Sequence, residues 1–120
     1  MYRKPLLVGI VQSMTEFAIE RTGDGPPVLF CCTGELDMAT APRLREALEP
    51  IDGDVLVDLT DLTFLDSSGV GALVAQRQRL AEHGSRLRLF GLQAPVRRTL
   101  EILGLADEFT GDDRVDPESP

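Results

Sequence analysis

Short, mainly apolar runs recur along the chain and are separated by stretches with a different spacing of apolar residues. Residues 28–32 and 55–59 are such runs, typical of strands buried on both faces of a sheet. Residues 86–90 alternate polar and apolar positions, as a half-exposed strand does. Residues 17–22 form a fourth strand candidate, and the turn residues at 23–27 predict that it pairs with 28–32 as a hairpin.

Three other stretches carry apolar residues at helical spacing. Thr40 is a candidate N-cap for the first, with Pro42 in its first turn, and the sequence at 52–54 ends it. The second stops at residues 83–84, and Gly104 is a C-terminal cap for the third. The predicted inner faces consist of Leu44, Ala47, Leu48 and Ile51; of Val70, Leu73, Val74, Leu80 and Ala81; and of Val96, Thr99, Leu100 and Leu103.

The resulting order is strand, strand, helix, strand, helix, strand, helix. It predicts an α/β fold with about four strands in a mixed sheet, opened by a hairpin, and with helices packed on that sheet. At 120 residues the chain has the length of one domain. Residues 111–120 are acidic and rich in turn formers, which predicts a flexible tail.

Charge and cysteine content narrow the partners. With 20 acidic and 12 basic residues the net charge is −8, so direct binding of nucleic acid is not expected. Cys31 and Cys32 are neighbours in a predicted strand and point to opposite faces, which argues against a disulfide between them. The apolar stretch 6–11 is too short for a signal peptide or a membrane span, so we expect a cytoplasmic protein without membrane contact.

The segment LDSSGVG at 65–71 begins the second predicted helix and holds the candidate chemistry. Either Asp66 or Ser67 can cap the unpaired N–H groups there. Gly69 and Gly71 each cost a helix roughly 0.5–1 kcal/mol relative to alanine, so another backbone is expected to approach closely, from the same fold or from a partner. A phosphate on a serine at this position would meet free N–H donors and the helix dipole.

The residue spacing in this segment does not match known nucleotide-binding motifs or a catalytic triad. A phosphate-binding loop would need Gly-Lys-Ser/Thr, and a dinucleotide fingerprint would need Gly or Ala where Val74 stands. His83 lies at the far end of the same helix, about 24 Å from Ser67, so no catalytic triad forms. Asp37 and Asp66 could approach each other, but nothing indicates a pocket around them. The chain is therefore not expected to be an enzyme, or to hold a metal or cofactor.

Three motifs carry a family resemblance. Thr-Gly-Glu-Leu-Asp at 33–37, the run from 57 to 71, and Pro-Val-Arg-Arg at 95–98 with Leu-Gly-Leu at 103–105 resemble the STAS-domain anti-sigma factor antagonists of bacteria. The resemblance spans residues 14–110 and implies a STAS fold, with 1–13 as an N-terminal extension.

The resemblance also implies a partner-switching mechanism. The unmodified protein would bind an anti-sigma factor serine kinase, a Bergerat-fold ATPase, and so free the sigma factor; phosphorylation at Ser67 would end this binding, and a metal-dependent serine phosphatase would reverse it. The choice of Ser67 over Ser68 rests on the resemblance alone. The implied partner-binding surface consists of Asp37, Asp66, Ser67, Ser68, Gly69 and Gly71.

The resemblance favours a monomer acting in stress response or sporulation. The alternative is a STAS module that scaffolds a larger signalling complex or binds a small ligand without phosphoswitching.

Overall fold

The computed structural model describes residues 16–110, so the extension predicted at 1–13 and the tail predicted at 111–120 lie outside the described residues. The elements are β1 (Ala18–Thr22), β2 (Val28–Leu36), α1 (Ala41–Leu48), β3 (Val55–Leu65), α2 (Ser67–Glu82), β4 (Leu87–Phe90), α3 (Ala94–Ile102) and α4 (Ala106–Thr110). The predicted α/β order is confirmed.

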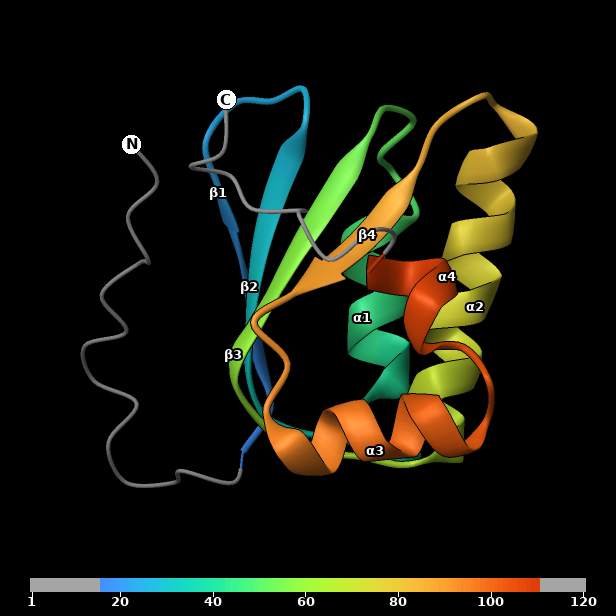
Figure 1. Ribbon diagram of the computed structural model, residues 1–120. Helices are drawn as coiled ribbons and strands as arrows, with labels where there is room; N and C mark the ends of the chain where they lie inside the picture. The colour runs from blue at the N-terminus through green and yellow to red at the C-terminus, as the bar shows by residue number, and fades with distance from the viewer. Residues whose placement is uncertain (1–15, 111–120) are drawn as a thin grey trace.

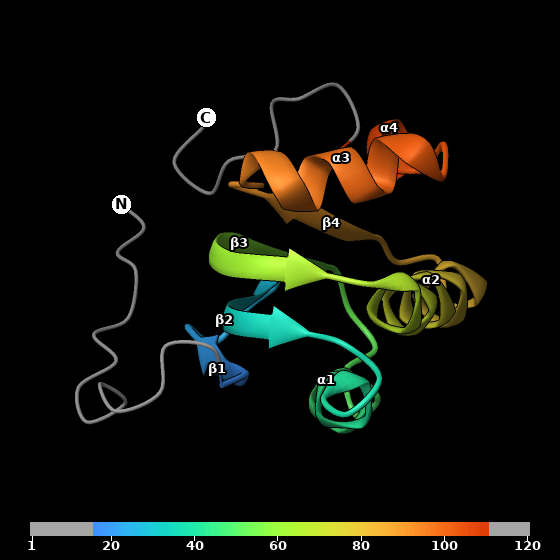
Figure 2. The same cartoon turned by 90° about the horizontal axis from the view of Figure 1, so that it is seen from below.

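The four strands form one mixed sheet in the order β1-β2-β3-β4. β1 and β2 pair antiparallel as the predicted hairpin, whereas β2, β3 and β4 run parallel. Helices α1 and α2 lie side by side on one face of the sheet, α3 packs against β3, and α4 packs beside β4 (Figures 1 and 2). The carboxyl ends of β2 and β3 therefore lie next to each other at the end of the sheet where α1 and α2 begin.

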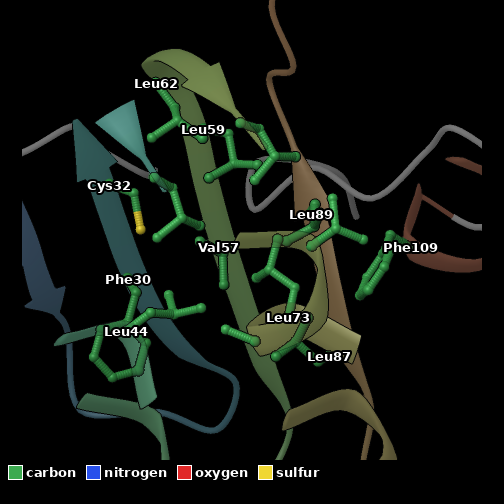
Figure 3. Close-up of a cluster of buried hydrophobic side chains, with 14 of the residues drawn as sticks. Phe30, Cys32, Leu44, Val57, Leu59, Leu62, Leu73, Leu87, Leu89 and Phe109 are labelled. Carbon is green, nitrogen blue, oxygen red and sulfur yellow. The ribbon is translucent and has the colours of Figure 1, made fainter. Parts of the chain in front are cut away.

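The hydrophobic core fills the space between the sheet and its helices (Figure 3). Alternate residues of the central strands point into it, including Phe30 and Cys32 of β2 and Val57 and Leu59 of β3, because side chains alternate across a strand. Phe109 of α4 closes the core near β4. This packing fixes where the strands end, and hence where the polar residues beyond them lie.

Strands β2 and β3 are longer than predicted, ending at Leu36 and Leu65 instead of 32 and 59. Their register shifts between Cys31 and Thr33 and again between Gly34 and Glu35, and Gly34 has a φ of 86° that other residues rarely adopt. These irregularities allow β2 and β3 to stay paired beyond their apolar runs, through polar residues that the sequence pattern did not assign to strands.

Four details of the helix predictions are wrong. α1 ends at Leu48, so Ile51 lies beyond it, and α4 was not predicted. Ala81 and Leu103 were assigned to inner faces but are exposed. The buried side of the second half of α2 consists of Gln76 and Leu80, and α3 has already ended at Ile102. Cys31 and Cys32 are both buried, and no disulfide joins them, as predicted.

Candidate functional site

The first turn of α2 is organised by Asp66. This residue has extended backbone angles, φ −107° and ψ −177°, and its Oδ1 accepts a hydrogen bond from the N–H of Gly69 at 2.9 Å. Its carbonyl oxygen accepts from the N–H of Val70 at 3.0 Å. Of the two capping candidates in the sequence, Asp66 is the N-cap and Ser67 is not.

Ser67 is the first residue of α2 and is exposed, whereas Ser68 is half-buried. Within residues 16–110, neither the hydroxyl nor the N–H of Ser67 takes part in a hydrogen bond. The N–H of Ser68 is also unpaired there. The Ser67 hydroxyl can therefore react without disturbing the cap, and two N–H donors lie beside it.

The two glycines of this turn differ in what surrounds them. A Cβ on buried Gly69 would lie 2.7 Å from the carbonyl oxygen of Leu36 and 2.7 Å from Cδ1 of Leu65. Gly71 is exposed, and a Cβ there would have nothing within 4 Å. Close packing inside the fold explains Gly69, whereas the fold gives no reason for Gly71.

The structure brings Asp37 and Asp66 to the same edge of the sheet. Leu36 of β2 pairs with Leu65 of β3, and each acid follows one residue later. The N–H of Asp66 donates to the carbonyl oxygen of Leu36 at 3.2 Å, which joins the two strand ends. The two acids therefore follow neighbouring strand ends, and the Oδ1 atom of each accepts hydrogen bonds within its own turn.

Asp37 also holds the turn that leads into α1. Its Oδ1 accepts from the N–H groups of Ala39 at 3.0 Å and Thr40 at 3.1 Å, and from the Thr40 hydroxyl at 3.2 Å. Thr40 occupies the N-cap position as predicted, but its side chain makes no capping bond and donates to the carbonyl oxygen of Glu35 at 2.9 Å. Asp37 therefore shapes the backbone beside Ser67 in addition to supplying charge.

Two exposed apolar side chains flank the acids and were missed in the sequence. Met38, 76% exposed, follows Asp37, and Phe64, 45% exposed, precedes Asp66 by two residues. Large apolar residues in a turn and at a strand end are the signal that could have identified them. We call Asp37, Met38, Phe64, Asp66, Ser67, Ser68 and Gly71 the switch face.

The structure keeps His83 apart from Ser67. His83 is the C-cap of α2, and its Nδ1 lies 2.9 Å from the carbonyl oxygen of Arg79, at the opposite end of the helix from Ser67. Within residues 16–110 no three His, Cys, Asp or Glu side chains are grouped to hold a metal ion. Burial raises the pKa of the Cys32 thiol well above its usual range, so this thiol stays protonated.

Comparison with known proteins shows which family the chain belongs to. The sequence model of the STAS domain matches residues 18–117. The chain belongs to the STAS-domain family of anti-sigma factor antagonists. A protein of Listeria monocytogenes named anti-sigma-B factor antagonist is 44% identical over 78 residues, covering 62% of this chain and 68% of the relative. Its namesake from Staphylococcus aureus is 37% identical over 78 residues, covering 62% and 72%.

Solved structures show the same fold for this STAS domain. Unphosphorylated SpoIIAA, an anti-sigma factor antagonist, superposes with a TM-score of 0.64 at 24% identity, covering 76% of this chain and 83% of that one. The phosphorylated form from Bacillus gives a TM-score of 0.61 at 22% identity, covering 73% and 85%. The murine anion transporter Slc26a9 contains a similar fold, with a TM-score of 0.57 at 16% identity over 62% of this chain and 13% of that one. The fold alone therefore does not determine function.

No helix within residues 16–110 is both long enough and apolar enough to span a bilayer.

Proposed function

We propose that this STAS domain is an anti-sigma factor antagonist that, when unphosphorylated, binds an anti-sigma factor serine kinase of the Bergerat ATPase fold and releases the sigma factor. Phosphorylation of Ser67 ends the complex, and a metal-dependent serine phosphatase restores it. The exposed hydroxyl of Ser67, free of any capping role at the start of α2, is the observation that carries this proposal. The site of action is the cytoplasm, and the antagonist acts as a monomer.

Phosphorylation of Ser67 changes the surface more than the fold. The phosphate adds about −1.5 to −2 charges, and the free N–H groups of Ser67 and Ser68 can donate hydrogen bonds to its oxygens at the positive end of the helix dipole. Asp66 retains its bond to Gly69, so the cap survives. In a complex, the same phosphate lies beside Asp37 and Asp66 in a desolvated interface, where like charges cost several kcal/mol.

The switch face offers a partner both charge and apolar area. Met38 and Phe64 are exposed apolar side chains close to the acids in sequence, and such side chains can dominate binding energy when they enter a partner's pocket. Gly71 leaves space on the next turn of α2 for a backbone or a cleft wall to approach. Gly69 contributes indirectly, by allowing α2 to start close against β2.

The test uses purified wild type, Ser67→Ala and Ser67→Glu chains with Ser68→Ala as the matched control. Each is immobilised to isolate its partner from host lysate, and the recovered ATPase is purified and titrated against each chain. We expect wild type, Ser67→Ala and Ser68→Ala to bind alike and Ser67→Glu to bind at least tenfold more weakly. With ATP, intact mass should rise by one phosphate in wild type and Ser68→Ala only.

Equal binding by all four chains would contradict the switch and favour a scaffolding STAS module. Phosphate uptake by Ser67→Ala would move the modified residue to Ser68.

A further inference from the structure

A cleft of about 320 Å³ is lined by residues from the second half of α2, from the start of β4 and the loop before it, and from α4. Three arginines line it: Arg77 of α2, Arg86 just before β4, and Arg88 within β4. The chain has only 12 basic residues and a net charge of −8, so three cations around one hollow run against its overall charge. We call this hollow the arginine cleft.

Carboxylates do not balance these cations. Nη2 of Arg77 lies 3.5 Å from Oε1 of Glu108, and the same guanidinium lies over the Phe109 ring. Among residues 16–110, Glu108 is the only acidic side chain that lines the cleft. The guanidinium groups of Arg86 and Arg88 have no carboxylate oxygen within 4.0 Å in the described part of the chain. Like charges held together are unfavourable, so a bound anion would stabilise this arrangement.

The remaining lining suits a small ligand. Ala81 and Leu87 supply apolar surface, and Gln78 supplies an amide. The hydroxyl of Ser85 donates to the carbonyl oxygen of Asp52 at 2.7 Å, which fixes the loop before β4. The N–H of Arg86 donates to Oδ1 of Asp54 at 2.9 Å, which fixes the residue just before β4. The volume is at the lower end of the roughly 300–1,000 Å³ typical of ligand pockets.

We propose that the arginine cleft binds a compact ligand carrying linked phosphates. Each guanidinium offers five N–H donors in a planar fork that matches phosphate oxygens two at a time. Three such forks around a small volume need many acceptors close together, and a phosphate offers three oxygens where a carboxylate offers two. Two or more phosphates joined in one molecule satisfy that demand in the available space.

This site is separate from the switch face. Arg77 lies ten residues after Ser67, or about 15 Å along α2 at 1.5 Å per residue. The proposal therefore stands whether or not Ser67 is phosphorylated.

The test is calorimetric titration of the full chain with pyrophosphate and tripolyphosphate at low ionic strength, with citrate as the carboxylate comparison. We expect saturable binding to one site, with tripolyphosphate binding more tightly than pyrophosphate. Citrate should bind about tenfold more weakly than pyrophosphate. Arg86→Gln and Arg88→Gln should each weaken binding about tenfold, because each removes a charge-assisted hydrogen bond. Arg45 is an exposed residue of α1 outside the cleft, so Arg45→Gln is the matched control and should bind as wild type does.

Glu108→Gln gives a result in the opposite direction. It releases Arg77 and removes the competing carboxylate, so phosphate binding should tighten. NMR of the arginine Nε–H groups should show shifts at Arg77, Arg86 and Arg88 on titration, with none at Arg45.

Three results would overturn the proposal. One is a double Arg86→Gln, Arg88→Gln chain that binds as tightly as wild type, and another is citrate binding as tightly as pyrophosphate. The third is the behaviour of a full chain with Asp112, Asp113 and Asp116 changed to asparagine. If these changes alone shift the Nε–H groups of Arg86 and Arg88, the chain's own acidic tail occupies the cleft.

Discussion

Replacing each glycine of the first α2 turns by alanine separates a packing role from a docking role. Both substitutions gain helix propensity, about 1 kcal/mol each, because glycine is the less favourable residue in a helix. At Gly71 the new methyl group has nothing within 4 Å, so Gly71→Ala should stabilise the fold by about 1 kcal/mol. For a domain of this size that corresponds to a Tm increase of about 4–8 °C.

At Gly69 the same gain is opposed by overlap. The new methyl group would lie 2.7 Å from the Leu36 carbonyl oxygen, which already accepts a hydrogen bond from Asp66 and belongs to a paired strand. Overpacking of this kind costs about 1–3 kcal/mol. Because the propensity gain is common to both variants, their difference in unfolding free energy isolates that overlap.

The assay is urea unfolding followed by circular dichroism at equilibrium, with equal m-values required for both variants. A difference below about 0.5 kcal/mol between Gly69→Ala and Gly71→Ala would refute the packing explanation of Gly69. Binding to the isolated kinase supplies a second readout. Gly71→Ala should bind more weakly although it is the more stable chain, and unchanged binding would remove Gly71 from the switch face.

Three further predictions concern the cap, the exposed anchors and a buried thiol. Asp66→Ala should lower the unfolding free energy by about 1 kcal/mol, whereas Ser67→Ala should change it by less than about 0.5 kcal/mol, as measured by urea unfolding; equal losses would return the capping role to Ser67. Met38→Ser and Phe64→Ser should weaken kinase binding in calorimetry while leaving Tm within a few degrees, and a Tm loss without a binding loss would make them packing residues. Burial raises the pKa of Cys32, so the folded state retains a proton that the unfolded state releases above about pH 9. The unfolding free energy should therefore be unaffected by this thiol below that pH and should fall as pH rises, by up to about 1.4 kcal/mol per pH unit. Urea midpoints between pH 8 and pH 10 test this, and an unchanged slope in Cys32→Ala would assign it to another group.

The order of elements could be predicted because each depends on local spacing. The hairpin, the three longer helices and the four strands follow from runs such as 28–32 and from the caps near Thr40 and Gly104. Strand lengths could not be predicted, because the continuation of β2 depends on the positive φ of Gly34 and on its register with β3. Helix α4 has five residues, too few for a helical period to be recognised.

The site was predicted in composition but not in the role of each residue. Asp66 and Ser67 are equally good caps in sequence, and only the bond from Gly69 distinguishes them. The two glycines are equally unusual in a helix, and their difference lies in Leu36, which is distant in the chain. Met38 and Phe64 attract attention only once their exposure is known.

The bond from Asp66 to the Leu36 carbonyl oxygen, together with the contact of Gly69 with the same residue, has a consequence for how such antagonists diverge. These contacts join the end of β2 to the start of α2, so a change in the backbone of one segment of the switch face would also displace the other. Under the proposed function, a duplicated copy of this chain would acquire a new kinase by exchanging the side chains that project from that frame, such as Met38 and Phe64. Parallel pathways in one cell would then be kept separate by those exposed side chains, while Ser67, the proposed phosphorylation site, and its support stay the same.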